Sequence, residues 1–278
     1  MAEITAAAVK ALRDKTDMPM MMCKDALKEA DGDADRAMQI LAEKAGKRLD
    51  KRAENATEEG RIYTGVSDDL SKAVMVEVQC ESAPVAGSES LAKLGDALVK
   101  QLLTGPGAAS VDELLAQPNP DGSGTLAELH ESIANKIQEK IVVARHATAA
   151  GPVGVYVHHN GKVGVLLAAA GEKLDAPVLR DVAMHVAAMR PTVAVVDQVD
   201  PARVAEERAK LTEEAKSTGK PDNIVEKIVD GKMKVFFKDE AGVLTEQAFA
   251  KDDSKSVSQV MAEAGLKVVD FTLFVLGQ

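Results

Sequence analysis

Aromatic side chains are scarce in this chain of 278 residues, making up 3% of it, and tryptophan is absent. The hydrophobic core must therefore be built from aliphatic side chains and methionine. Positive charge is also in deficit, because 44 acidic residues against 34 basic ones leave a formal net charge of −10. Nucleic-acid affinity comes largely from lysine and arginine at phosphates, so this balance argues against direct nucleic-acid binding and suits a protein partner.

Cysteine is limited to Cys23 and Cys80, each inside an apolar pattern. We interpret both as buried free thiols in a reducing cytoplasm. A nucleophilic Cys80 paired with a histidine stays open as an alternative, although such a thiol needs an activating environment. Zinc-type ligand spacing, a phosphate-binding glycine loop and a Gly-x-Ser-x-Gly elbow are all missing. The sequence therefore predicts a binding protein rather than an enzyme, with no metal and no cofactor.

Long apolar runs are missing as well. No stretch is long enough to span a membrane, and the first residues lack the charged and apolar regions of a signal peptide. We therefore expect a cytoplasmic protein without membrane contact.

The residues that are present predict three short helices within residues 1–46. The first carries Leu12 on its apolar face and ends before Pro19. The second ends at the turn Asp31-Gly32-Asp33, where Asp33 can cap the third. Three such helices would form a compact head.

The run Met18 to Met22 lies between the first two of these helices. Methionine is an adaptable apolar side chain, so the run either fills the core of the head or faces a groove of a partner. Residues 47–60 are polar and charged and predict a linker. Its basic residues face either solvent or an acidic partner: Lys47, Arg48, Lys51 and Arg52.

The middle of the chain predicts two hairpins, each followed by a helix. The first pairs residues 61–66 with 73–79, and an exposed polar loop follows Cys80. The second pairs 153–158 with 162–168 across an Asn-Gly turn. We interpret this recurrence as an internal repeat, which predicts two similar α+β subdomains. Their expected bounds are 61–140 for the first, and 141–199 with 233–278 for the second.

Several amphipathic helices are predicted in these subdomains. The clearest carries Leu91, Leu94, Leu98 and Leu102 at helical spacing after a start near Ser88. Shorter helices are expected over residues 111–115, 125–137, 178–189 and 256–264.

Residues 200–232 predict an arm of two antiparallel helices inserted into the second subdomain. Asp200-Pro201 is a typical helix start, Gly219-Lys220-Pro221 turns the chain, and one thin apolar seam joins the helices. Residues 233–237 then lead back into the subdomain. A final strand over 266–276 places four apolar residues on one face: Val269, Phe271, Leu273 and Val275.

The histidines suggest no catalytic site. His158 and His159 are neighbours in a predicted strand, where successive side chains point to opposite faces, so they would not chelate one ion together. His185 lies within an apolar helix and is expected to be a hydrogen-bonded core residue.

Taken together, many segments of the chain resemble bacterial elongation factor Ts. The resemblance covers essentially the whole chain in the right order. Near the amino terminus the matching segments are Leu12-Arg-Asp-Lys-Thr16, Met20-Met21, Cys23-Lys24 and Ala26-Leu27. Further along they are the strand end at Cys80, Tyr156-Val-His158, Gly164-Val165-Leu166, Met184-His185-Val186-Ala187-Ala188, Lys227-Ile228-Val229-Asp230-Gly231 and Phe249 to Lys255.

This resemblance implies a guanine-nucleotide exchange factor for elongation factor Tu, the GTPase of translation elongation in protein biosynthesis. It also implies a ubiquitin-associated-like (UBA-like) three-helix head and a coiled-coil arm in the second of two α+β subdomains. By the same resemblance, Leu12, Met20 and Met21 would pack on Tu beside the guanine pocket, and His158 would lie at that interface. Such a factor has no active site of its own. Whether it forms a homodimer stays open.

The loop after Cys80 departs from the family. The family usually has Thr-Asp-Phe-Val-Ala there, and its Asp and Phe enter Tu and disturb the Mg²⁺ site. This chain has Ser82, Ala83, Pro84, Val85 and Ala86 instead. We predict that the first four of these residues form the loop that dislocates Mg²⁺ and promotes GDP release. The alternative is a scaffold that binds Tu with weak exchange, because the Asp-Phe pair is replaced.

Overall fold

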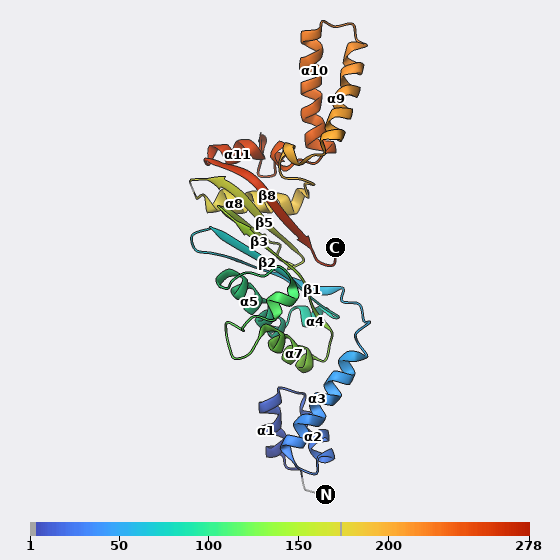
Figure 1. Ribbon diagram of the computed structural model, residues 1–278, viewed down its shortest axis with the longest axis vertical. Helices are drawn as coiled ribbons and strands as arrows, with labels where there is room; N and C mark the ends of the chain where they lie inside the picture. Colours follow the sequence, from blue (N-terminus) through green and yellow to red (C-terminus); the bar gives the residue numbers. More distant parts are fainter. Residues whose placement is uncertain (1–3, 173) are drawn as a thin grey trace. The chain divides into compact units, whose positions relative to one another are not determined.

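The computed structural model describes residues 4–172 and 174–278 and has an α+β fold of short helices and small sheets (Figure 1). The α+β class predicted from the sequence is confirmed. The chain forms two compact units. The first comprises the residues up to Arg61, Val76–Arg145 and Gly277, and the second comprises Ile62–Met75, His146–Leu276 and Gln278.

Three helices at the start of the first unit pack around a small apolar core (Figure 1). They are α1 (Ala6–Thr16), α2 (Met20–Glu29) and α3 (Ala34–Asp50). Asp33 caps α3 as the sequence predicts, because its Oδ1 accepts hydrogen bonds from two backbone N–H groups of the first turn. Helix α3 continues to Asp50, into the stretch predicted as a linker. The buried side chains of this core are Val9, Leu12, Met18, Cys23, Ala26, Leu27, Ala30, Ala37, Leu41 and Ala45.

Three strands form the first sheet in the order β1-β2-β3. They are β1 (Glu59–Val66), β2 (Lys72–Cys80) and β3 (Ile141–Ala150), so the first predicted hairpin is present. The turn between β1 and β2 is held by Asp69, whose carboxylate accepts hydrogen bonds from Ser67 Oγ and Ser71 Oγ at 2.7 Å. These bonds lower the pKa of Asp69 to about 2.

Helices follow β2 in the first unit, and all but the first of them match the sequence pattern. They are α4 (Ala83–Ala86), α5 (Glu89–Thr104), α6 (Val111–Leu115) and α7 (Leu126–Ile137). Ser88 caps α5 through a hydrogen bond from the Leu91 backbone N–H at 3.2 Å. The four leucines predicted to face inward on α5 are all fully buried. The spacing of apolar residues therefore identified the packed face of this helix.

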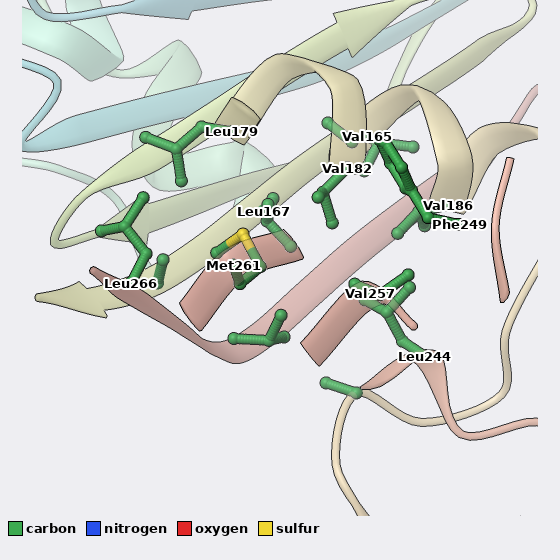
Figure 2. Packing of buried hydrophobic residues seen from close by; sticks show 14 residues of the cluster. Val165, Leu167, Leu179, Val182, Val186, Leu244, Phe249, Val257, Met261 and Leu266 are labelled. Atoms are coloured by element: carbon green, nitrogen blue, oxygen red, sulfur yellow. The ribbon is translucent and has the colours of Figure 1, made fainter. Parts of the chain in front are cut away.

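The second unit is built on a sheet of order β4-β5-β8, in which both pairs are antiparallel. Helices α8 (Ala176–Met189) and α11 (Val257–Glu263) pack against the sheet, and Figure 2 shows the apolar side chains gathered between them. The strands are β4 (Val153–Val157), β5 (Val163–Gly171) and β8 (Leu266–Val275), which confirms the second predicted hairpin. The short elements are β6 (Ala248–Phe249), β7 (Asp252–Ser256) and the 3₁₀ turns η1 (Val196–Gln198) and η3 (Leu244–Glu246).

A β-bulge in β8 overturns part of the predicted alternation. Ala168 pairs with Asp270 and Ala169 with Val268, so Val269 is an extra residue without an opposite partner on β5. Val269 is consequently 47% exposed instead of facing the core. After the bulge, Phe271 and Leu273 do face the core of Figure 2, on the same side as Leu266 and Val268 before it.

Two helices, α9 (Pro201–Lys216) and α10 (Asp222–Val235), pack side by side as a hairpin (orange in Figure 1). Asp200 caps α9 through a hydrogen bond from the Ala202 N–H at 2.9 Å, as the Asp-Pro pair predicts. The buried seam of the hairpin includes Leu211, Ala215, Val225 and Val229.

Helix α10 extends further than the sequence suggested. Met233 lies within it, and Phe236–Glu240 continue as a π-helical turn, η2, so residues 233–237 are helical. Arg203 lies over the ring of Phe236, with its guanidinium carbon 5.3 Å from the ring centroid. This contact joins the start of α9 to the residue that follows α10, so the two helices are in contact at the end of the hairpin where the chain enters and leaves it. In the described residues, no helix has both the length and the apolar character needed to cross a membrane.

Candidate protein-binding site

The segment after β2 forms the single helical turn α4, so its prediction as an irregular loop was wrong. Proline suits the first turn of a helix, because its φ is already fixed there and its missing N–H is not needed. Pro84 occupies such a position. Ala83 and Pro84 are exposed, whereas Val85 is half-buried. The turn therefore presents Ala83 and Pro84 to the solvent.

Glu81 fixes the base of this turn. Its carboxylate accepts hydrogen bonds from Arg52 Nη1 at 2.7 Å, from Asn55 Nδ2 at 2.7 Å and from the Lys140 backbone N–H at 2.6 Å. Burial opposes ionisation of Glu81, but the three donors outweigh it, so the pKa of Glu81 lies below its usual value. Residues 52–55 are therefore attached to the end of β2 and are not a freely solvated linker.

Ser82 and Cys80 add two further contacts at the base of α4. Ser82 Oγ donates to the carboxylate of Glu139, at 2.8 Å from Oε1 and 3.0 Å from Oε2. Cys80 Sγ donates to the Ser82 carbonyl oxygen at 3.3 Å. Burial raises the pKa of the Cys80 thiol to about 11. Its burial and its raised pKa both argue against the alternative of a nucleophilic Cys80.

The head presents two methionines at the start of α2. Met20 is 49% exposed and Met21 is 64% exposed, whereas Met18 is buried in the core. The sequence left open whether the run Met18 to Met22 fills the core or faces outward. In the structure, Met18 lies in the core, whereas Met20 and Met21 face outward. Leu12 is 2% exposed, so its side chain supports the head from inside.

His158 lies in a pocket of about 330 Å³ in the second unit. It shares a hydrogen bond of 3.0 Å with the hydroxyl of Tyr156. The opposite wall comes from α8, through Met184, Ala187 and Ala188. Two of the segments that carry the family resemblance thus line the same pocket, although they lie almost thirty residues apart in the chain.

A close approach between α8 and β4 supports this pocket. Gly154 lies in β4 directly beneath Leu179 of α8, and a Cβ atom at position 154 would overlap the Leu179 carbonyl oxygen. Glycine is the residue that permits such an approach of two backbones. Gly154 therefore sets the separation of the two elements that form the pocket walls.

The prediction about His158 and His159 was wrong in its geometry. Strand β4 ends at Val157, so the two histidines lie in the turn and not in an alternating strand. Their ring centroids are 4.2 Å apart. Even so, no group of three or more histidine, cysteine or acidic side chains suited to a metal ion occurs among residues 4–172 and 174–278.

His185 is the buried, hydrogen-bonded histidine that the sequence predicts. Its Nδ1 accepts a hydrogen bond from the Ala250 backbone N–H at 3.1 Å, which assigns the ring proton to Nε2. Nε2 then donates to Gln247 Oε1 at 3.0 Å. Burial lowers the pKa of His185, although the bond to Gln247 opposes this change. His185 therefore joins α8 to the segment near β6 as a neutral side chain.

Sequence reasoning missed Glu77 and Glu81 as structural residues. Glu77 is 1% exposed and accepts hydrogen bonds from Arg145 Nε at 2.8 Å and from the Gly277 N–H at 2.9 Å. A single acidic residue inside an otherwise apolar strand was the available signal, because a buried charge requires a partner. The partners Arg145 and Gly277 of Glu77 could not be inferred, since they lie 68 and 200 positions away in the sequence.

Exposed apolar side chains on firmly held segments are typical of proteins that act by binding other proteins. Turn α4 and the Met20–Met21 pair present such side chains. The family described as Elongation factor TS matches residues 84–278. The chain belongs to the elongation factor Ts family, whose members act in translation elongation.

Full-length relatives agree with this assignment. An elongation factor Ts of Bordetella petrii is 40% identical over 280 residues, which cover 100% of this chain and 93% of the relative. One from Paenarthrobacter aurescens is 40% identical over 285 residues and covers 100% of both chains. One from Aquifex aeolicus is 38% identical over 275 residues, covering 94% of this chain and 92% of the relative.

Proposed function

We propose that this chain is a guanine-nucleotide exchange factor that binds elongation factor Tu in the cytoplasm and promotes release of GDP. The observation that carries the proposal is the exposed turn α4 on its fixed base. It stands at the position where the family has its Asp-Phe pair. Exposed side chains on a rigid base lose little entropy on binding, which suits a segment that must displace groups of its partner.

Three other residues contribute to the proposed contact with Tu. Met20 and Met21 offer two exposed thioether side chains, which adapt well to an apolar surface. His158, fixed by its bond to Tyr156, offers a polar edge beside an apolar pocket wall. Leu12 acts from within the head by holding α2, because it is buried.

Exchange follows from thermodynamic linkage. A factor that binds nucleotide-free Tu more tightly than Tu·GDP must weaken GDP binding by the same factor. Mg²⁺ and the contacts to the phosphates supply much of the grip on a bound nucleotide. Insertion of α4 near the Mg²⁺ site would therefore favour the nucleotide-free state. In this proposal the chain has no active site of its own, since the effect comes from binding alone.

A second candidate is a Tu-binding scaffold with weak exchange. The observation in its favour is that α4 presents Ala83 and Pro84, which carry neither a charge nor an aromatic ring. An apolar tip of this size fills less space in a partner than a phenylalanine does.

One assay separates the two candidates. Tu from the same organism is loaded with fluorescent GDP, and the rate of GDP release is measured with and without the purified chain, while binding is measured by calorimetry. An exchange factor accelerates release in proportion to its concentration. Tight binding with an unchanged release rate supports the scaffold, and absence of binding refutes both candidates.

The family also suggests how the parts of the chain are related. The proposed architecture is a UBA-like head over residues 1–46, a connection over 47–60 that includes the end of α3 and the residues bonded to Glu81, two related α+β subdomains and a coiled-coil arm over 200–232. The apolar cores of α1–α3 and of the α9–α10 hairpin support the first and last of these assignments. A truncation that begins after residue 46 tests the head directly: it should fold, and it should bind Tu more weakly than the full chain.

A further inference from the structure

The sulfur atoms of this chain differ sharply in their access to solvent. Cys23 and Cys80 are fully buried, and burial also raises the pKa of the Cys80 thiol to about 11. Thiol oxidation needs an accessible thiolate, so neither cysteine is a ready target. Among the described residues, the most exposed sulfur-bearing side chains are thioethers: Met20 at 49%, Met21 at 64% and Met189 at 52%.

The exposure of Met20 and Met21 follows from the geometry of α2. The helix begins at Met20 after Pro19, and its inward face is formed by Cys23, Ala26 and Leu27. Met22 packs partly against the core of the head, and Met18 is buried within it. Met20 and Met21 are thus adjacent thioethers that add little to the core. Their oxidation would leave the packing of the head largely unchanged.

We propose that Met20 and Met21 form a reversible oxidation site that controls binding of the partner GTPase. The reaction with a hydroperoxide is a two-electron step. The thioether sulfur attacks the terminal peroxide oxygen, and an S–O bond forms as the O–O bond breaks. The leaving oxygen takes up the hydroxyl proton, so the peroxide departs as an alcohol, or as water when it is hydrogen peroxide. Methionine sulfoxide reductases reverse the step, returning the thioether and water while two thiols are oxidised to a disulfide.

The effect on binding follows from polarity. A sulfoxide carries a strongly polar oxygen that water solvates well, and burial against an apolar surface removes that solvation. We expect affinity for Tu to fall by about ten-fold or more when both methionines are sulfoxides. This inference rests on the proposed function, because it assigns regulation to the methionine pair of the proposed contact.

Met189 provides a matched internal control. It is about as exposed as Met20 but ends helix α8 in the second unit, and its side chain does not line the His158 pocket. The full-length wild type, the variant Met20→Leu/Met21→Leu and the variant Met189→Leu are each treated with hydrogen peroxide. Peptide mass spectrometry locates the added oxygen, and Tu binding and GDP release are measured before treatment, after treatment and after repair with both reductases.

In the expected result, positions 20 and 21 are oxidised before the buried methionines. Treated wild type and treated Met189→Leu lose affinity about ten-fold or more, and repair restores it. The variant Met20→Leu/Met21→Leu has the same affinity before and after treatment, because leucine has no oxidisable sulfur. Circular dichroism shows that all treated proteins remain folded.

Two results would overturn the proposal. One is unchanged affinity of wild type that carries sulfoxide at both positions, and the other is an equal loss in the leucine variant. Neither result affects the stimulation of GDP release by the untreated protein. Each would therefore refute the oxidation site and leave the proposed function standing. Untreated protein that neither binds Tu nor accelerates GDP release would refute both.

Discussion

The backbone N–H of Lys140 donates to Glu81 Oε1 at 2.6 Å, although the two residues lie 59 positions apart. The other oxygen of the same carboxylate accepts from Arg52 and Asn55. Lys140 Nζ in turn donates to the carbonyl oxygen of Ala53 at 2.7 Å. The side chain of Glu81 thereby joins the end of β2, which carries it, to the start of β3 and to the segment that follows α3. Turn α4 begins two residues after Glu81, so its position depends on this carboxylate.

We predict that Glu81→Ala lowers the free energy of unfolding by about 1–3 kcal/mol, because it leaves three donors from two segments without their acceptor. It should also weaken the chain's stimulation of GDP release from Tu, since α4 loses its fixed base. Urea denaturation measures the first effect, and hydrogen exchange over residues 82–87 reports the loosened turn. The exposed Glu58 supplies the control variant Glu58→Ala, for which both readouts should stay near wild type. Unchanged exchange protection in Glu81→Ala would contradict the prediction.

The double substitution Ala83→Asp/Pro84→Phe should accelerate GDP release. At these exposed positions it introduces the charge and the ring that the resemblance to the family implies there. A buried aromatic contact of this kind contributes about 2 kcal/mol or more, which corresponds to about 30-fold in rate. Stopped-flow fluorescence of labelled GDP measures the change. The same pair of substitutions at the exposed Ser217 and Thr218 of the arm is the control, and it should leave the rate unaltered. If the double substitution at α4 does not accelerate GDP release, the contact that promotes release must lie elsewhere in the chain.

Local patterns predicted the elements of the fold well. The leucine spacing of α5, the Asn160-Gly161 turn and the Asp200-Pro201 helix start all act within a few residues, so their signals are complete in the sequence. The fully buried strand β2 could be read from its apolar run for the same reason.

Features that depend on distant partners were not predictable in this way. The bulge at Val269 shifts the face of β8 and is set by its pairing with β5, which no pattern inside β8 encodes. Ile224 is 42% exposed while the neighbouring Val225 is buried, because the seam of the arm is fixed by α9. The anchoring of α4 by Glu81 likewise depends on Arg52 and Lys140. The sequence therefore predicted where α4 lies but not what holds it.

We predict that His185 makes the stability of the chain depend on pH. Its pKa is lowered in the folded state by burial, so the folded protein binds fewer protons there than the unfolded chain. The stabilisation is present above the unfolded pKa of about 6.5 and is lost as pH falls from there through the folded pKa. The slope contributed by one histidine is at most about 1.4 kcal/mol per pH unit.

Thermal melts between about pH 5 and pH 8 test this prediction for wild type and His185→Gln. The variant should be less stable at neutral pH, because Gln247 and the Ala250 N–H lose a fitted partner, and its melting temperature should fall less on acidification. His159→Gln is the control, since His159 is exposed and should leave the pH profile unchanged. Identical profiles for wild type and His185→Gln would refute a role for this histidine.

The Glu77–Arg145 pair should respond asymmetrically to substitution. Glu77 is 1% exposed, whereas the side chain of Arg145 is 35% exposed. Arg145→Met leaves a buried carboxylate without its cation and should lower the free energy of unfolding by about 3 kcal/mol or more. Glu77→Leu should cost less, because the half-exposed guanidinium can turn towards water. Removing both charges in Glu77→Leu/Arg145→Met should recover part of the loss seen with Arg145→Met, since no buried charge then remains.

Denaturant unfolding of the three variants in a double-mutant cycle measures this coupling. The exposed Arg180 of α8 provides the control Arg180→Met, which should change stability by no more than about 0.5 kcal/mol. A negligible loss for Arg145→Met would mean that the Gln79 side chain and the Gly277 N–H suffice for Glu77. In that case the arginine would be dispensable, and the carboxylate would act mainly by holding the backbone at Gly277.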